Sequence, residues 1–216
     1  MSQVWFTADT HFGHSNIIKY CKRPFLSDAE LEQLESDPRG RWRVSPDTVE
    51  RHDTALLEAI NSRLSKHDTL WVLGDFCWGD EKEAKGYLDR INCKNVNFVW
   101  GNHDHRSIGR LFKKTIEQGK ISVQGQKIWL NHYPMRSWDG RFHGAWQLYG
   151  HVHDRLASED RKNMTLLTKD VGVDACDYAP ISFEQLSEYM APRVVEFEAA
   201  KARFIAGESL EGESID

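Results

Sequence analysis

Five short apolar runs along the chain each end in a polar residue that can bind metal or move protons. Each run is of strand length and rich in aromatic or β-branched side chains, which favours β-strands. The runs are VWFTA before Asp9, TLWVLG before Asp75, NFVWG before Asn102, KIWLN before His132 and WQLYG before His151. A sixth run, DVGVD at 170–174, has a similar character but no histidine. The pattern predicts six strands.

Segments with helical periodicity lie between these runs. Ser45 followed by Pro46 is typical of an N-cap with proline at the first helical position, and the apolar residues that follow it fall on one helical face. Residues 80–91 open with acidic side chains and place apolar residues at helical spacing. A third helix is predicted over 183–190, with its end before Pro192.

Strands that alternate with helices are typical of an α/β domain. In such sheets ligands gather at the carboxyl ends of the strands. We therefore expect the polar clusters to meet at one edge of the fold, although they are far apart in the sequence.

The length of 216 residues fits a single domain. We expect one domain over 1–205, with a loop insertion at 22–43 that mixes arginines with acids and prolines. The end of the chain, 206–216, is small, polar and acidic, which predicts a flexible tail.

Charge and hydropathy exclude several classes of function. The net charge is −5 and there is no long basic run, so a nonspecific grip on nucleic acid through bulk charge is not expected. No signal segment or membrane-spanning run is present, which predicts a soluble, cytoplasmic protein without a membrane partner. Four widely spaced cysteines without a C-x-x-C pair predict free thiols.

The polar clusters hold a set of potential metal ligands without any thiolate. Oxygen and imidazole donors suit Mn²⁺, Fe, Zn²⁺, Co²⁺ or Ni²⁺. Seven ligands exceed what one tetrahedral zinc needs, and they suit two divalent ions about 3.5–4 Å apart that share a carboxylate. The candidates are Asp9, His11, Asp75, Asn102, His132, His151 and His153.

The order D-x-H, G-D, G-N-H-D, a lone H and G-H-x-H resembles the calcineurin-like binuclear metallophosphoesterase superfamily, and the match extends from Asp9 to His153. The chain is most similar to small bacterial and phage phosphoesterases that open with a D-T-H-F-G-H-x-N-I-I-like stretch and close with V-G-V-D and P-I-S. The resemblance implies a four-layer α/β/β/α sandwich of two mixed sheets.

The resemblance also implies a role for each candidate residue. Asp75 would bridge two metal ions, with Mn²⁺ as the first choice, and a hydroxide between the ions would attack phosphorus. His103 would assist the leaving oxygen, and Asp104 would orient a neighbouring histidine. The first ion would be held by Asp9, His11 and His153, and the second by Asn102, His132 and His151.

Three further residues are candidates for substrate binding. His14 could contact the substrate phosphate, and packing in its loop is an equally good interpretation. Arg136 and Arg141 follow His132 in a turn-rich loop and could clamp a phosphate. The alternative for this pair is ordinary solvated charge.

We expect a metal-dependent phosphoesterase, and a phosphodiesterase in particular. The protein Ser/Thr phosphatases of the superfamily carry G-D-x-V-D-R-G at the bridging aspartate, whereas this chain has Gly74-Asp75-Phe76-Cys77-Trp78-Gly79-Asp80. The alternatives are a phosphomonoesterase acting on a nucleotide or phosphoprotein, a nuclease acting on nucleic acid ends or single strands, and a metal-binding scaffold without activity. The sequence does not decide the oligomeric state.

Overall fold

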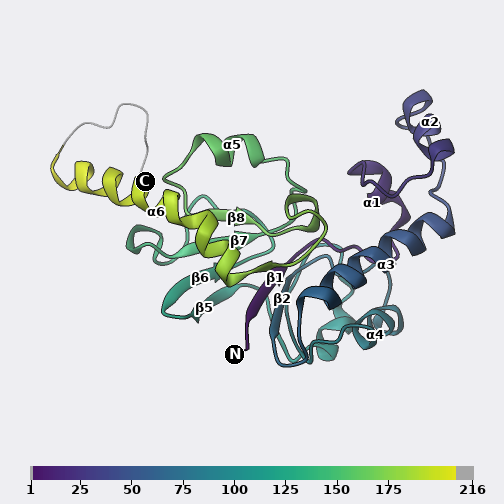
Figure 1. Cartoon of the computed structure of the whole chain (residues 1–216), viewed down its shortest axis with the longest axis horizontal. Coiled ribbons are helices and arrows are strands. Elements are labelled where there is room, and N and C mark those ends of the chain that lie inside the picture. Colours follow the sequence, from purple (N-terminus) through teal and green to yellow (C-terminus); the bar gives the residue numbers. More distant parts are fainter. Residues whose placement is uncertain (1, 208–216) are drawn as a thin grey trace.

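A computed structural model describes residues 2–207 and contains two mixed β-sheets (Figure 1). The first sheet has the order β4 (Lys114–Ile116), β3 (Asn95–Val99), β2 (Thr69–Leu73), β1 (Val4–Thr7) and β9 (Ile181–Ser182). The second has the order β5 (Gly119–Val123), β6 (Gln126–Leu130), β7 (Trp146–Tyr149) and β8 (Thr168–Asp170). β1 to β4 are parallel, as are β6 to β8, while β9 and β5 pair antiparallel with their neighbours.

Helices accompany both sheets. Helices α3 and α4 lie beside the first sheet, and α5 and α6 beside the second (Figure 1). The α-helices are α1 (Ser15–Tyr20), α2 (Asp28–Ser36), α3 (Pro46–Arg63), α4 (Glu81–Asp89), α5 (Ala157–Lys162) and α6 (Phe183–Ile205). Short 3-10 turns cover Arg106–Leu111, Arg141–His143 and Val173–Ala175. The two-sheet α/β arrangement predicted from the sequence is confirmed.

The central strands are buried on both faces, which explains their near-continuous apolar character. Alternate side chains of β1 and β2 point to opposite sides. One set, Trp5, Leu70 and Val72, packs with the apolar face of α3. The other set, Phe6, Trp71 and Leu73, packs with the second sheet and with α6. The first sheet therefore lies between α3 on one face and the second sheet on the other.

The carboxyl ends of the parallel strands meet because the two sheets are joined at that edge. Ala8, just after β1, forms a parallel bridge with Gly172, just after β8. The β1–β2 pairing also continues past both strands, since the amide of Asp9 donates to the carbonyl of Gly74 at 3.1 Å. The segments that follow β1, β2 and β8 are thus held side by side.

Three sequence-based predictions of local structure were wrong in detail. The sixth strand ends at Asp170, and most of 170–174 is a turn. Helix α6 continues through Pro192 to Ile205, because residues beyond the proline, Phe197 and Ala200 among them, are buried and hold the helix in place. Residues 22–43 are not simply a loop, because α2 lies inside them behind a capping box formed by Ser27 and Glu30.

The acidic tail predicted for 206–216 lies, from residue 208 on, outside the described residues. Within 2–207, no helix combines the length and the apolar character needed to cross a membrane. All four cysteines are free, as the sequence predicts.

Candidate metal centre

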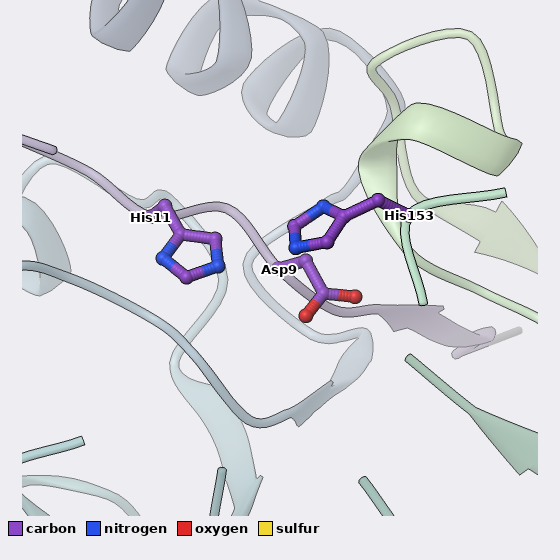
Figure 2. Close-up of side chains that lie close together, drawn as sticks. All are labelled: Asp9, His11 and His153. Carbon is purple, nitrogen blue, oxygen red and sulfur yellow. The ribbon is translucent and has the colours of Figure 1, made fainter. Parts of the chain in front are cut away.

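The first group of candidate ligands consists of Asp9, His11 and His153. One ligand atom from each lies within 4.8 Å of the others. Asp9 and His11 follow β1, whereas His153 follows β7 of the other sheet. Figure 2 shows the three side chains close together, with both imidazole rings beside the carboxylate of Asp9. Residues separated by more than 140 positions, as His151 and Asp9 are, thus meet at the joined edge of the two sheets.

The second group consists of Asp75, His132 and His151, whose ligand atoms also lie within 4.8 Å of one another. The side chain of Asn102 joins them, because its Oδ1 is 3.1 Å from Nε2 of His132. These residues follow β2, β6, β7 and β3 respectively. The structure therefore brings all seven predicted ligands to one site in two groups.

Asp75 lies between the two groups. Its Oδ2 is 3.4 Å from Nε2 of His11 and 3.4 Å from Nε2 of His132. Its other oxygen, Oδ1, accepts the backbone N–H of His103 at 2.9 Å. One oxygen is thus fixed by the backbone, while the other faces an imidazole of each group, which is the position a bridging carboxylate requires.

Two ligand rings are oriented by hydrogen bonds through Nδ1. The Nδ1 of His132 is 2.8 Å from the carbonyl oxygen of Leu73, and the Nδ1 of His153 is 2.7 Å from Oδ2 of Asp174. Both partners accept, so Nδ1 carries the hydrogen in each ring. In the neutral rings, the lone pair on Nε2 is then free to bind an ion.

The donor set fits metal ions. Nε2 of His11 is buried with no hydrogen-bond partner among the described residues. At His132, Nε2 faces two acceptor oxygens, from Asn102 and Asp75, so either a proton or a cation must lie between them. Buried polar groups without partners are costly, and a divalent ion would satisfy them together.

The backbone is strained at several of the candidate ligands. Five candidate ligands adopt positive φ, a region that non-glycine residues enter at a cost of about 1–3 kcal/mol each. They are Asp9 (55°), His11 (47°), Asp75 (53°), His151 (72°) and His153 (50°). Two glycines leave room for the carboxylates, since a Cβ at Gly101 would lie 2.2 Å from Oδ1 of Asp75, and one at Gly150 would lie 2.5 Å from Oδ2 of Asp9. Such clustered strain is typical of functional sites.

Without ions the site retains protons. Burial raises the pKa of Asp9 to about 7. Burial alone would lower the pKa of His132 and His153, but Asp75 raises the first to about 8 and Asp174 raises the second to about 10. Burial lowers the pKa of His11 to about 2. Ions that enter the site would therefore compete with protons on Asp9, His132 and His153.

His103 and Asp104 follow the candidate ligand Asn102, and their side chains make different contacts. The ring of His103 is exposed, and its centroid is 5.5 Å from that of His11. The prediction that Asp104 orients a histidine is wrong. Its carboxylate accepts three backbone N–H groups instead, from Asp75 and Gly101 at 2.8 Å and from Phe76 at 2.9 Å. Asp104 therefore fixes the turn that carries Asp75.

The three predicted substrate-binding residues do not all lie against the candidate ligands. His14 lies beside the site, with its ring 5.4 Å from that of His11, and it stacks on the exposed Trp78 at 4.3 Å. Arg136 and Arg141 form no hydrogen bond or ion pair with a candidate ligand in the described residues. The guanidinium of Arg141 instead donates to the carbonyl of Arg136 and lies over Trp138.

Sequence reasoning missed two residues that support the first group, Asp174 and Arg23. Asp174 accepts from His153 and forms an ion pair with Arg23. Cys21 lies close to His153 and Asp174, and the three could form a further metal-binding group. The guanidinium of Arg23 already balances the charge of Asp174, so this group needs no ion of its own. The V-G-V-D stretch was the one signal that pointed to Asp174.

Known proteins resemble this chain along most of its length. The profile of the calcineurin-like phosphoesterase superfamily domain matches residues 49–168. An uncharacterized protein of Methanocaldococcus jannaschii is 29% identical over 187 residues, which cover 85% of this chain and 89% of that protein. The gene 66 protein of Mycobacterium phage L5 is 27% identical over 189 residues, covering 72% of this chain and 80% of that protein.

A solved structure has a similar fold. The crystal structure of a protein of unknown function from Aquifex aeolicus superposes with a TM-score of 0.62 at 24% identity, covering 88% of this chain and 100% of that one. Its fold is therefore similar over nearly the whole domain.

Proposed function

The chain belongs to the calcineurin-like phosphoesterase superfamily, and from that premise we propose that it hydrolyses phosphodiesters at a centre of two metal ions. Family membership makes it a metal-dependent phosphoester hydrolase. The observation that carries the two-ion proposal is the position of Asp75. Its Oδ2 lies 3.4 Å from one imidazole of each ligand group.

We assign each ion to the group that its ligands form. Asp9, His11 and His153 would hold the first ion, and Asn102, His132 and His151 the second, with Asp75 shared. Donors of this kind without a thiolate suit Mn²⁺, which we propose as the natural metal, ahead of Fe, Zn²⁺, Ni²⁺ and Co²⁺. Two ions held there would supply Lewis acidity at the phosphoryl oxygens and would lower the pKa of water, so that hydroxide is available to attack phosphorus near neutral pH.

His103 would donate a proton to the departing oxygen. Its backbone N–H is bound to Oδ1 of Asp75 at 2.9 Å, which anchors the residue next to the shared ligand. Its ring forms no hydrogen bond with another described side chain and is exposed, so it can reach an ester oxygen. His14 lies beside it, with ring centroids 6.3 Å apart, and would contact the phosphate.

Exposed aromatic side chains on both ligand groups support a diester substrate. Trp78 is 53% exposed and stacks on His14, beside the first group. Tyr133 is 44% exposed, and its ring lies 4.6 Å from that of His151, in the second group. A diester carries one substituent on each side of phosphorus, so each substituent could pack on one of these rings. A nucleotide or a short single strand of nucleic acid has bases that can stack in this way.

The test compares bis(4-nitrophenyl) phosphate with 4-nitrophenyl phosphate under the same Mn²⁺ concentration. We expect a higher kcat/KM for the diester. Trp78→Ala should raise KM for the diester more than for the monoester, whereas Trp138→Phe, which alters a buried tryptophan, should change the two equally. A preference for the monoester would contradict the diesterase proposal and support a phosphomonoesterase. Absence of hydrolysis with bound metal would support a scaffold.

A further inference from the structure

Arg23 is one of the most deeply buried charged residues of the protein, with 1% of its surface exposed. It lies in the segment after α1, and its guanidinium forms five hydrogen bonds. We propose that Arg23 is a positioning residue that holds the three ligands of the first ion in place. This inference rests on the two-ion centre proposed above and assigns a task to a residue outside the ligand set.

The guanidinium clamps the turn that carries Asp9 and His11. Nη2 donates to the carbonyl of Asp9 at 2.8 Å, and Nη1 donates to the carbonyl of Thr10 at 3.2 Å. Asp9 and His11 flank this contact and both adopt positive φ. A turn strained at two positions relaxes unless something holds it, and two hydrogen bonds from a charged donor supply that hold.

The same guanidinium fixes the third ligand through Asp174. Nε and Nη2 donate to the two carboxylate oxygens of Asp174, at 2.9 and 2.8 Å, in a bidentate pair. Oδ2 of Asp174 in turn accepts from Nδ1 of His153 at 2.7 Å. This pairing sets both the orientation of the His153 ring and the nitrogen that faces the ion.

Residues of helix α3 in turn fix the guanidinium of Arg23. Its Nη1 lies 2.8 Å from Nε2 of His52, and Nδ1 of His52 lies 2.8 Å from Oδ1 of Asp53. Because arginine only donates, Nε2 of His52 accepts and its Nδ1 donates to Asp53. Asp53 also accepts the backbone N–H of Gly13 at 2.9 Å, so the chain of contacts returns to the loop after His11.

The hydrogen bonds of Arg23 to Asp9, Thr10 and Asp174 reach the first ligand group, and in the described residues none of its hydrogen bonds reaches the second. Asp75 and His132 take their support from Asp104 through the backbone and from Leu73, respectively. The asymmetry distinguishes positioning from general stability, because loss of Arg23 should weaken one ion and spare the other. Arg23, at the start of the predicted 22–43 insertion, would then support the metal centre.

The experiment is a Mn²⁺ titration of the metal-stripped full chain. Calorimetry measures the affinities, and a metal assay counts the ions bound per chain. The test variants are Arg23→Lys, which keeps the positive charge but loses the branched guanidinium, and Asp174→Asn, which keeps an acceptor for His153. The matched control is Arg193→Lys. Arg193 is 3% exposed and also donates to three carbonyls, those of Asn163, Leu166 and Asp160, but it lies on α6.

We expect the parent and Arg193→Lys to bind two ions with equal affinities. Both test variants should bind one ion as the parent does and the other about 10–100-fold more weakly, the usual loss when a residue behind a ligand is changed. Parent-like affinity for both ions in either variant that folds would overturn the inference, and so would equal weakening of both ions. A parent that binds fewer than two ions would contradict the proposed function instead.

Discussion

At the scale of single residues, His103 has an exposed ring beside candidate ligands of which Asp9, His11, Asp75 and His132 are buried. We predict that His103→Ala keeps both ions and lowers kcat. The loss should approach the range of about 10²–10⁴-fold typical of general acid assistance when the leaving group is a poor one, such as an alkoxide. An activated nitrophenyl ester needs little proton donation and should lose much less.

The measurement is kcat across a series of diesters whose leaving groups differ in pKa, with bound metal counted in each sample. A steeper dependence on leaving-group pKa in the variant is the expected result. His105→Ala is the control, since His105 is also exposed but bonds to Ser107. If His103→Ala loses an ion, His103 is a ligand and the role proposed here is wrong.

The order of motifs in the sequence was sufficient to propose the metal ligands, but not the residues that fix those ligands through hydrogen bonds. Each candidate ligand directly follows a recognisable strand, so the carboxyl-end rule places it. Arg23 and Asp174 are 151 residues apart, and no local pattern links them. Asp104 is adjacent to a histidine in the sequence, which suggested a pair, yet its carboxylate faces backbone N–H groups of the β2 turn.

At the scale of elements, strands rich in aromatic residues were predicted well, and short or edge strands were missed. β4 and β9 have only two or three residues each, too few for a period to appear, and β8 was predicted too far along the chain. Pro192 suggested a helix end, but the packing of α6 outweighs the missing hydrogen bond. Helix α2 has a readable signal in the Ser27-x-x-Glu30 capping box, whereas the charge of the segment favours a loop.

Glu30 joins two helix starts. Its carboxylate accepts from the backbone N–H and hydroxyl of Ser27 at 2.9 Å, from the N–H of Ser45 at 2.7 Å and from the hydroxyl of Thr48 at 2.7 Å. Burial would raise its pKa, but the hydrogen bonds from Ser27, Ser45 and Thr48 lower it from 4.5 to about 2. Glu30 therefore ties α2 to α3 through its ionised form.

We predict that Glu30→Gln destabilises the metal-free protein by roughly 1–2 kcal/mol at neutral pH. Because the folded pKa lies below the unfolded one, the stabilisation is complete above about pH 4.5 and is lost as the pH falls toward 2. Urea unfolding with a chelator present, at pH 7 and at pH 3, measures the difference. Glu35→Gln, an exposed site on the same helix, is the control. A difference that did not shrink in acid would contradict the ionised role of Glu30.

At the scale of the whole molecule, the centre exists because two sheets meet at the carboxyl ends of their parallel strands. Asp9, Asp75 and Asn102 follow strands of the first sheet, and His132, His151 and His153 follow strands of the second. The bridge between Ala8 and Gly172 joins the sheets at this edge. Neither sheet alone supplies all the ligands proposed for either ion, so we expect folding and metal binding to be coupled.

The most direct test of this account is the number of ions bound per chain in the parent and in Asp75→Asn, after loading with Mn²⁺ and removal of free metal. The control is Asp68→Asn, which alters a buried carboxylate that accepts backbone N–H groups of Gln3 and Ser65 at the opposite end of β2 from Asp75. We predict two ions in the parent and a larger loss in Asp75→Asn than in any other single-ligand variant, because both ions share that carboxylate. Equal occupancy in Asp75→Asn and the parent, or a single ion in the parent, would contradict the binuclear centre.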